Sequence, residues 1–184
     1  MCAAPGRHLQ TRAHRNSASL DHFLPGNLGV GTTLTHQGTV STIVGVFSFD
    51  FDGELWQDYL AEERSGAWWR FGVEPERGFR LAAFRPQPIP IDPGAATIMF
   101  QGDSYSLTES GEANFRAAGR TDTFDTGRYW YFDYENDQGT ILSFERFDSD
   151  PWKTSIGHRV NPRTVTIDNE IAMPSTQAPN SSGP

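Results

Sequence analysis

The most enzyme-like residues in the sequence are two glutamates, Glu135 and Glu145, on either side of a predicted turn at 137–139. Pairing of the flanking strands would bring both carboxylates to one face of a hairpin. Two carboxylates at a suitable separation can catalyse glycoside hydrolysis. Alternating carboxylates are also typical of a solvated sheet face, here with Arg146 or Lys153 nearby to neutralise them. We favour this second interpretation, so the sequence assigns no catalytic residue and leaves Glu135 and Glu145 as the alternative.

Metal and cofactor chemistry has little support. Asp50 and Asp52 resemble half of a calcium loop, but the distal glutamate and the other oxygen ligands are missing, and turn formation explains both residues. No pair of histidines has metal-ligand spacing; the five are His8, His14, His22, His36 and His158. The sequence contains neither a glycine-rich phosphate loop nor a nucleophile elbow. We therefore predict no metal and no cofactor.

Aromatic residues are the strongest feature, and seven of them form the candidate binding set: Trp56, Tyr59, Trp68, Trp69, Trp130, Tyr134 and Trp152. On the predicted strand 128–136, side chains alternate between one face with Trp130, Phe132 and Tyr134 and another with Tyr129, Tyr131, Asp133 and Glu135. Adjacent residues of a strand point to opposite faces, so one of Trp68 and Trp69 should leave the core face. Exposed large aromatics would indicate a contact surface for a partner or ligand. Alternatively, both faces of the sheet are covered and the aromatics are core.

Composition limits the class of protein. The chain has 184 residues and a net charge of −8, all of it carried by residues 28–167, which disfavours nucleic acid as a partner. Cys2 is the only cysteine, so no intramolecular disulfide or thiolate cluster can form. No apolar run is long enough to span a bilayer, and the first residues lack the hydrophobic stretch of a secretory signal. We expect a cytoplasmic protein that does not cross the membrane.

The elements that must position these residues are strands. Alternating apolar patterns predict them at 43–52, 54–63, 67–73, 78–85, 97–101, 104–109, 112–118, 128–136, 140–147, 152–156 and 164–167. Turn signals separate them at Asp52-Gly53, Ser65-Gly66 and Ser110-Gly111. Prolines in 86–94 cannot join a central ladder and predict a linker. Residues 1–27 and 168–184 are poor in apolar side chains and are predicted to be disordered.

The segments 33–38 (TLTHQG) and 97–102 (TIMFQG) resemble each other, and each half continues through an aromatic strand to a glycine turn. Either the chain contains a duplication, or two meanders share common turn residues by chance. The fold class we expect is all-β: two similar antiparallel meander halves, 28–85 and 95–167, packed as a split barrel or sandwich between disordered N- and C-terminal tails.

The segment 130–147 (WYFDYENDQGTILSFERF) followed by 152–157 (WKTSIG) resembles a bacterial family known as domain of unknown function 4178. Earlier segments agree, namely 28–34 (LGVGTTL), Val44-Gly45, 56–60 (WQDYL) and Trp68-Trp69. The resemblance spans residues 28–167. It implies a β-rich cytoplasmic bacterial protein with envelope-stress genes among its genomic neighbours. It supplies no catalytic residues.

Three functional hypotheses follow. The leading one is a non-enzymatic module that binds a protein partner, with a link to an envelope or membrane-stress system that rests on the family resemblance alone. The second is a β-barrel that binds a small ligand among its aromatic residues. The third is a carboxylate hydrolase using Glu135 and Glu145.

Overall fold

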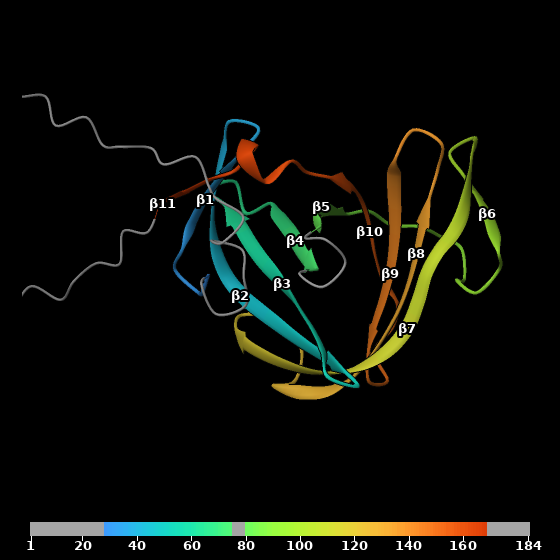
Figure 1. Ribbon diagram of the computed structural model, residues 1–184, viewed down its shortest axis with the longest axis horizontal. Helices are drawn as coiled ribbons and strands as arrows, with labels where there is room; N and C mark the ends of the chain where they lie inside the picture. Colours follow the sequence, from blue (N-terminus) through green and yellow to red (C-terminus); the bar gives the residue numbers. More distant parts are fainter. Residues whose placement is uncertain (1–27, 75–79, 169–184) are drawn as a thin grey trace, which may run out of the picture.

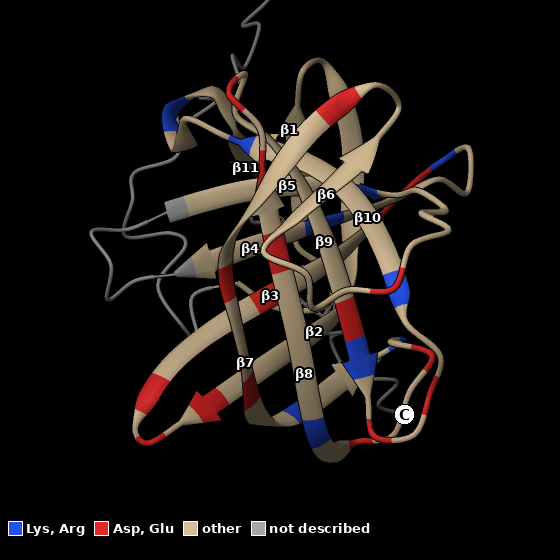
Figure 2. Ribbon diagram, turned by 90° about the vertical axis from the view of Figure 1, so that its right-hand side faces the viewer, with Lys and Arg blue, Asp and Glu red and all other residues tan. Residues whose placement is uncertain are grey.

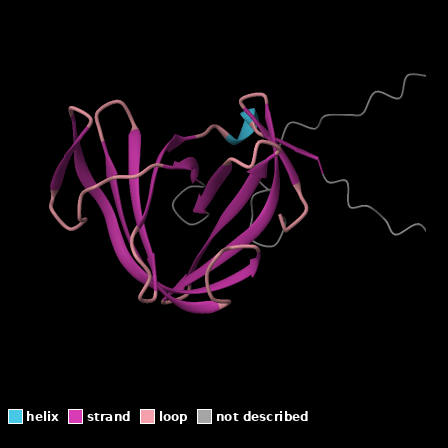
Figure 3. Ribbon diagram, turned by 180° about the vertical axis from the view of Figure 1, so that it is seen from behind, coloured by secondary structure: helices cyan, strands magenta, loops and turns pink. Residues whose placement is uncertain are grey.

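The computed structural model describes residues 28–74 and 80–168, where the regular elements are strands and one short 3-10 helix (Figure 3). The first half contains β1 (Thr33–His36), β2 (Thr39–Phe51), β3 (Glu54–Glu63), β4 (Trp68–Glu74) and β5 (Arg80–Pro86). The second half contains β6 (Thr97–Phe100), β7 (Asp103–Gly119), β8 (Thr126–Glu135), β9 (Thr140–Phe147), β10 (Lys153–Arg159), η2 (Pro162–Thr164) and β11 (Thr166–Asp168). The chain is therefore all-β, as predicted. Of the two predicted disordered tails, only Asp168 lies inside the described residues, where it ends β11.

All pairings are antiparallel, and eight strands close into a ring in the order β2-β3-β4-β5-β10-β9-β8-β7. The ring is closed by β2 and β7, which pair from Gly45↔Gly119 to Asp50↔Asn114. In Figure 1, the two limbs of the fold converge at this pairing and diverge above it. An eight-stranded ring is just wide enough to be filled by side chains or to hold one small ligand.

The arrangement of the two halves is nearly palindromic. β1 pairs with the beginning of β2, and β6 pairs with the beginning of β7. The turns at Gln37-Gly38 and Gln101-Gly102 take the same left-handed conformation, with φ of 50° and 78° in the first and 51° and 93° in the second. The similar segments seen in the sequence thus occupy corresponding places, and β2–β7 and β5–β10 join the two halves.

Three hydrophobic clusters stabilise this arrangement. Two lie on the outer face of the ring: one between β3–β5 and the segments around β1 and β11, the other between β8–β9 and β6. The third lies inside the ring near the β2–β7 pairing and contains Phe47, Phe49, Phe115 and Phe147. Both faces of the strands are therefore covered, so aromatic side chains are buried on both.

One predicted turn is wrong. Ser110-Gly111 lies in the middle of β7, which runs without interruption from Asp103 to Gly119. Gly111 pairs with Tyr131 of β8, and a Cβ at Gly111 would lie 3.1 Å from the Tyr131 ring. The glycine is there because it makes room for an aromatic ring on the neighbouring strand. In the sequence, the same Ser-Gly pair looks like a turn signal.

The proline-rich segment 86–94 forms a crossover packed against the outer face. Ile89 is buried in the outer cluster beside β8 and β9, and its amide donates to Thr154 Oγ1 at 3.2 Å. The Gly94 amide donates to the hydroxyl of the fully buried Tyr134 at 2.8 Å. The segment thus covers the second half as well as linking it to the first.

Candidate functional site

A cavity of about 280 Å³ lies inside the ring. Aromatic side chains form part of its wall: Trp56 on β3, Phe84 on β5, and Tyr129 and Tyr131 on β8. Phe51 and Leu55, each about half exposed, line it at the β2–β3 hairpin, facing the stretch Thr108–Glu112 of β7. The cavity is therefore open where β2 has ended and no longer pairs with β7.

Small inward-facing residues leave this space unfilled. Gly72 on β4 and Ala82 on β5 pair with each other and line the cavity. A Cβ at Gly72 would lie 3.2 Å from Asp58 Oδ1, so the glycine also allows the Asp58 carboxylate to lie against β4. A shift in register between Leu107 and Glu109 of β7 adds a bulge at the cavity wall.

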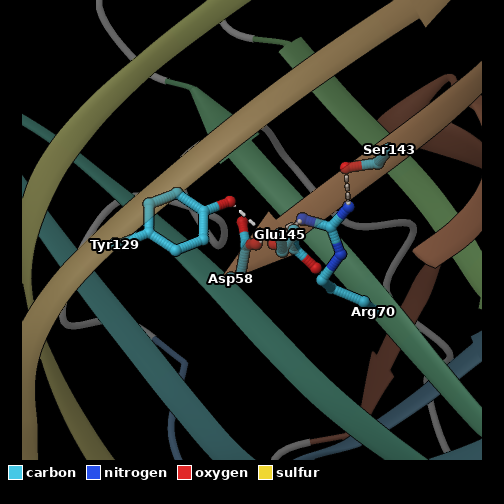
Figure 4. A network of polar contacts seen from close by, with 5 residues as sticks. All are labelled: Asp58, Arg70, Tyr129, Ser143 and Glu145. Atoms are coloured by element: carbon cyan, nitrogen blue, oxygen red, sulfur yellow. Dashed lines mark hydrogen bonds and ion pairs between the residues drawn. The ribbon is translucent and has the colours of Figure 1, made fainter. Parts of the chain in front are cut away.

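An ionic network lies at the base of the cavity, between β3, β4, β8 and β9 (Figure 4). Arg70 Nη1 lies 2.7 Å from Asp58 Oδ2 and 2.7 Å from Glu145 Oε1. Arg70 Nη2 donates to Ser143 Oγ at 2.9 Å, and the Tyr129 hydroxyl donates to Glu145 Oε1 at 2.7 Å. The guanidinium also lies 4.1 Å from the centre of the Phe84 ring. One cation thus holds two carboxylates from opposite sides of the ring.

Burial shapes the protonation of this network. Desolvation raises the pKa of Asp58 and that of Glu145, and the Arg70 guanidinium opposes this rise at both. Burial alone would lower the pKa of Arg70, but the Glu145 and Asp58 carboxylates raise it above its ordinary value. Burial and then Glu145 raise the pKa of Tyr129, so its hydroxyl remains a hydrogen-bond donor. Arg70 is therefore a permanent cation.

Asp133 differs from the other two acids because no cation pairs with it directly. It lines the cavity from β8, and its Oδ1 atom is buried with no hydrogen-bond partner. Desolvation raises its pKa to about 7, and Glu145 and Glu109 add to the rise; Arg70 and the Ser143 hydroxyl oppose it. Asp133 therefore changes its charge near neutral pH.

Glu135 and Glu145 both face the inside of the ring, as the register of β8 and β9 shows. Each carboxylate is already paired with an arginine. Glu145 is bound by Arg70 and Tyr129, and Glu135 Oε2 lies 3.1 Å from Arg159 Nη2. The predicted pair thus shares a face, but each carboxylate already has a counter-charge.

The structure does not bring the seven candidate aromatics together. Trp56 lines the cavity, whereas Tyr59 and Trp69 are buried in the outer cluster on β3–β5. Tyr134 is buried in the other outer cluster, with Trp152 packed against it. The remaining two, Trp68 and Trp130, are partly buried, each with an arginine over its ring: Arg120 on Trp68, and both Arg128 and Arg146 on Trp130.

Asp58 and Arg70 are functional candidates that the sequence patterns did not identify. Each is a charged residue within an aromatic strand: Asp58 directly precedes Tyr59, and Arg70 stands between Trp69 and Phe71. A charged residue at a position that alternates with buried aromatics indicates an inward polar site when both sheet faces are covered. That signal was present, but it could not be interpreted without knowing that the ring closes.

The aspartates at the β2–β3 turn have a structural role. Asp50 Oδ1 accepts a hydrogen bond from the Gly53 amide at 3.1 Å, and Asp52 has φ of 51°. Within 28–74 and 80–168, no group of three or more His, Cys, Asp or Glu residues is arranged to hold a metal ion. In the same ranges, no helix has the length and apolar character needed to span a membrane.

Comparison with known proteins gives a family but no activity. Two relatives, uncharacterised proteins of Mycobacterium bovis and Mycobacterium tuberculosis, are each 25% identical over 156 residues, which is 81% of this chain and 75% of the relative. No solved structure matches the chain. A family model described as Domain of unknown function (DUF4178) matches residues 29–162, a range that contains every strand of the ring. The chain therefore belongs to the family of domain of unknown function 4178.

Proposed function

We propose that this protein binds a small molecule in the cavity inside its strand ring. The observation that carries the proposal is an open cavity of about 280 Å³ with aromatic walls and a fixed polar network at its base. Ligand sites typically combine apolar walls with a few well-placed polar groups, and their volumes begin at about 300 Å³. The ligand is accordingly small.

The construction of the site also supports binding. Its polar groups stand on four strands of a closed ring, and Arg70 is held by three side chains. Groups fixed on regular strands recognise a ligand without first having to be ordered, which lowers the entropic cost of binding.

The other two hypotheses have less support. A protein-binding module of the kind expected from the aromatics would expose a patch near Trp68 or Trp69, but Trp69 is only 7% exposed and Trp68 is covered by Arg120. A hydrolase using Glu135 and Glu145 would need a carboxylate released from its arginine. Both hypotheses, together with a cytoplasmic location and a link to an envelope system, stay predictions.

The test is an NMR titration with 2-phenylethanol as a neutral aromatic probe. The backbone amides of Gly72 and Gly111 report on opposite walls of the cavity. Ala82→Leu adds three carbon atoms to the cavity, whereas Ala96→Leu makes the same change at an exposed position before β6.

We expect saturable chemical-shift changes at both glycines in the wild type and in Ala96→Leu. In Ala82→Leu the affinity for the probe should be at least tenfold lower, which is on the order of the effect of losing one buried contact group. Equal responses in all three proteins, or no response at Gly72 and Gly111 in the wild type, would refute the proposal.

A further inference from the structure

The charges around the cavity are unbalanced. Six carboxyl side chains line it, but only two guanidinium groups do: the acids are Glu54, Asp58, Glu109, Glu112, Asp133 and Glu135, and the cations are Arg70 and Arg159. Acidic positions are visible at the β2–β3 turn and along β7 in Figure 2. An anionic ligand entering here would meet repulsion on several sides.

Both cations are already engaged. Arg70 lies between Asp58 and Glu145, and Arg159 is paired with Glu135. If Arg70 bound a ligand carboxylate or phosphate instead, the buried acids Asp58 and Glu145 would lose their cation, which is costly. If Arg159 did so, the partly exposed Glu135 would lose its counter-charge. The arginines of the cavity therefore serve the protein's own acids rather than an anionic ligand.

Asp133 is the acid of the cavity base that has no ion-pair partner of its own among the described residues. Several groups face it: Glu109 from β7, Ser143 and Glu145 from β9, Arg70 from β4, and Asp58 through Arg70 from β3. On β10, Arg159 also lines the cavity, but it is paired with Glu135. Asp133 Oδ1 has no hydrogen-bond partner. With Arg70 shared by two other carboxylates, an ionised Asp133 would be a buried negative charge without a counter-ion.

The walls beside Asp133 suit an organic cation. Tyr129 and Tyr131 are stacked with ring centres 5.6 Å apart, and Trp56 lies edge-on to Tyr131 at 6.1 Å. Aromatic faces attract ammonium groups, more strongly where water is excluded. The same rings give apolar contact to the rest of a small ligand.

We propose, on the basis of the binding function proposed above, that the ligand is a small organic monocation, an ammonium group on an apolar or aromatic body, whose charge lies beside the Asp133 carboxylate. The ammonium donates a hydrogen bond to Asp133 and supplies the counter-charge that the network lacks. The apolar body packs between the aromatic wall and the small residues Gly72 and Ala82.

Binding of such a cation is linked to proton release. Because burial raises the pKa of Asp133 to about 7, its carboxyl is mostly protonated at pH 6 and mostly ionised at pH 8. A cation binds the ionised form, so its affinity should rise about tenfold between pH 6 and pH 8. A neutral ligand of the same shape gains no such pH dependence.

The experiment uses three matched probes in calorimetric or NMR titrations at pH 6 and pH 8: 2-phenylethylammonium, neutral 2-phenylethanol and anionic 3-phenylpropionate. The full chain is compared with Asp133→Asn, which preserves shape and removes the charge. We expect the wild type to prefer the cation at pH 8, with the anion weakest, and to lose about tenfold of cation affinity at pH 6. Asp133→Asn should remove both the preference and the pH dependence.

The outcomes separate the two proposals. If 2-phenylethanol binds as tightly as 2-phenylethylammonium and neither depends on pH, the cation inference is overturned while the binding function stands. If none of the probes shifts the cavity glycines, both fall. The pH dependence in the wild type provides the test even if Asp133→Asn fails to fold.

Discussion

Asp133→Asn should make the protein more stable at pH 8. In the wild type, burial raises the pKa of this carboxyl from 3.8 to about 7. Between these values the folded state holds a proton that the unfolded state has released, so the free energy of unfolding falls as pH rises. The stabilisation is fully present below pH 3.8 and is lost by about pH 7. Asparagine, which mimics the neutral acid, does not titrate and should escape this loss.

The size of the effect follows from the shift. Each pH unit between the two pKa values is worth about 1.4 kcal/mol, so the whole window is worth about 4 kcal/mol. Urea unfolding at pH 4 and at pH 8 measures it. We expect wild type and Asp133→Asn to differ little at pH 4, and the variant to be more stable at pH 8 by an amount approaching about 4 kcal/mol.

A control variant and a contradicting outcome sharpen this test. The control is Asp125→Asn, which makes the same change at an exposed acid in the loop before β8. We expect this variant to keep the pH dependence of the unfolding free energy that the wild type has. A loss of stability at pH 8 in Asp133→Asn would show that the ionised carboxylate is stabilised by Arg70. That result would contradict the assignment of an unmatched charge at this position.

Three further predictions concern the residues around the site. Arg70→Met leaves two buried carboxylates without their cation, so the free energy of unfolding in urea should fall by about 3–5 kcal/mol at pH 8 and by less at pH 5. The control Arg120→Met removes a half-exposed ion pair and should lower it by less than about 1 kcal/mol. Burial lowers the pKa of His36, and the nearby His158 and Arg85 lower it further, so the contribution of His36 to stability is present above pH 6.5 and is lost on acidification. His36→Phe should therefore reduce the fall in melting temperature between pH 7.5 and pH 5. A fall equal to that of the wild type would contradict this. Trp69→Ala removes a buried ring and should cost about 3–5 kcal/mol, measured by the same unfolding assay; a cost below about 1 kcal/mol would indicate that the ring is exposed after all.

The fold also explains why most of the described aromatic side chains are buried or covered, with Phe51 and Phe124 as exposed exceptions. A ring of strands has an inner and an outer face, and this protein covers both. Aromatic side chains of the ring strands fill part of the inner face, and β1, β6, β11 and the proline-rich crossover cover the outer face. Aromatic residues at odd and even positions of β8 are therefore both in contact with other side chains.

Much of the fold was determined by the sequence alone. Period-two alternation identified most of the strands, although it did not predict β1 and divided β7 in two. The hairpin at Asp52-Gly53 was predicted from residues that tolerate positive φ, where the structure has φ of 51° and 91°. The alternation also placed Tyr129, Tyr131 and Asp133 on one face of β8, which is the face that lines the cavity. The repeated glutamine-glycine turns indicated the two similar halves.

Only the tertiary structure decided which face was inside. Alternation separates two faces of a strand but does not rank them when both are buried, so it could not show that Asp58, Arg70 and Glu145 meet. Asp58 and Arg70 stand on the consecutive strands β3 and β4, but Glu145 on β9 is far from them in the chain, and the pairing of β5 with β10 and of β2 with β7 brings it to them. The unmatched charge of Asp133 is likewise a property of the closed ring, because desolvation depends on what surrounds a carboxyl group and not on its neighbours in sequence.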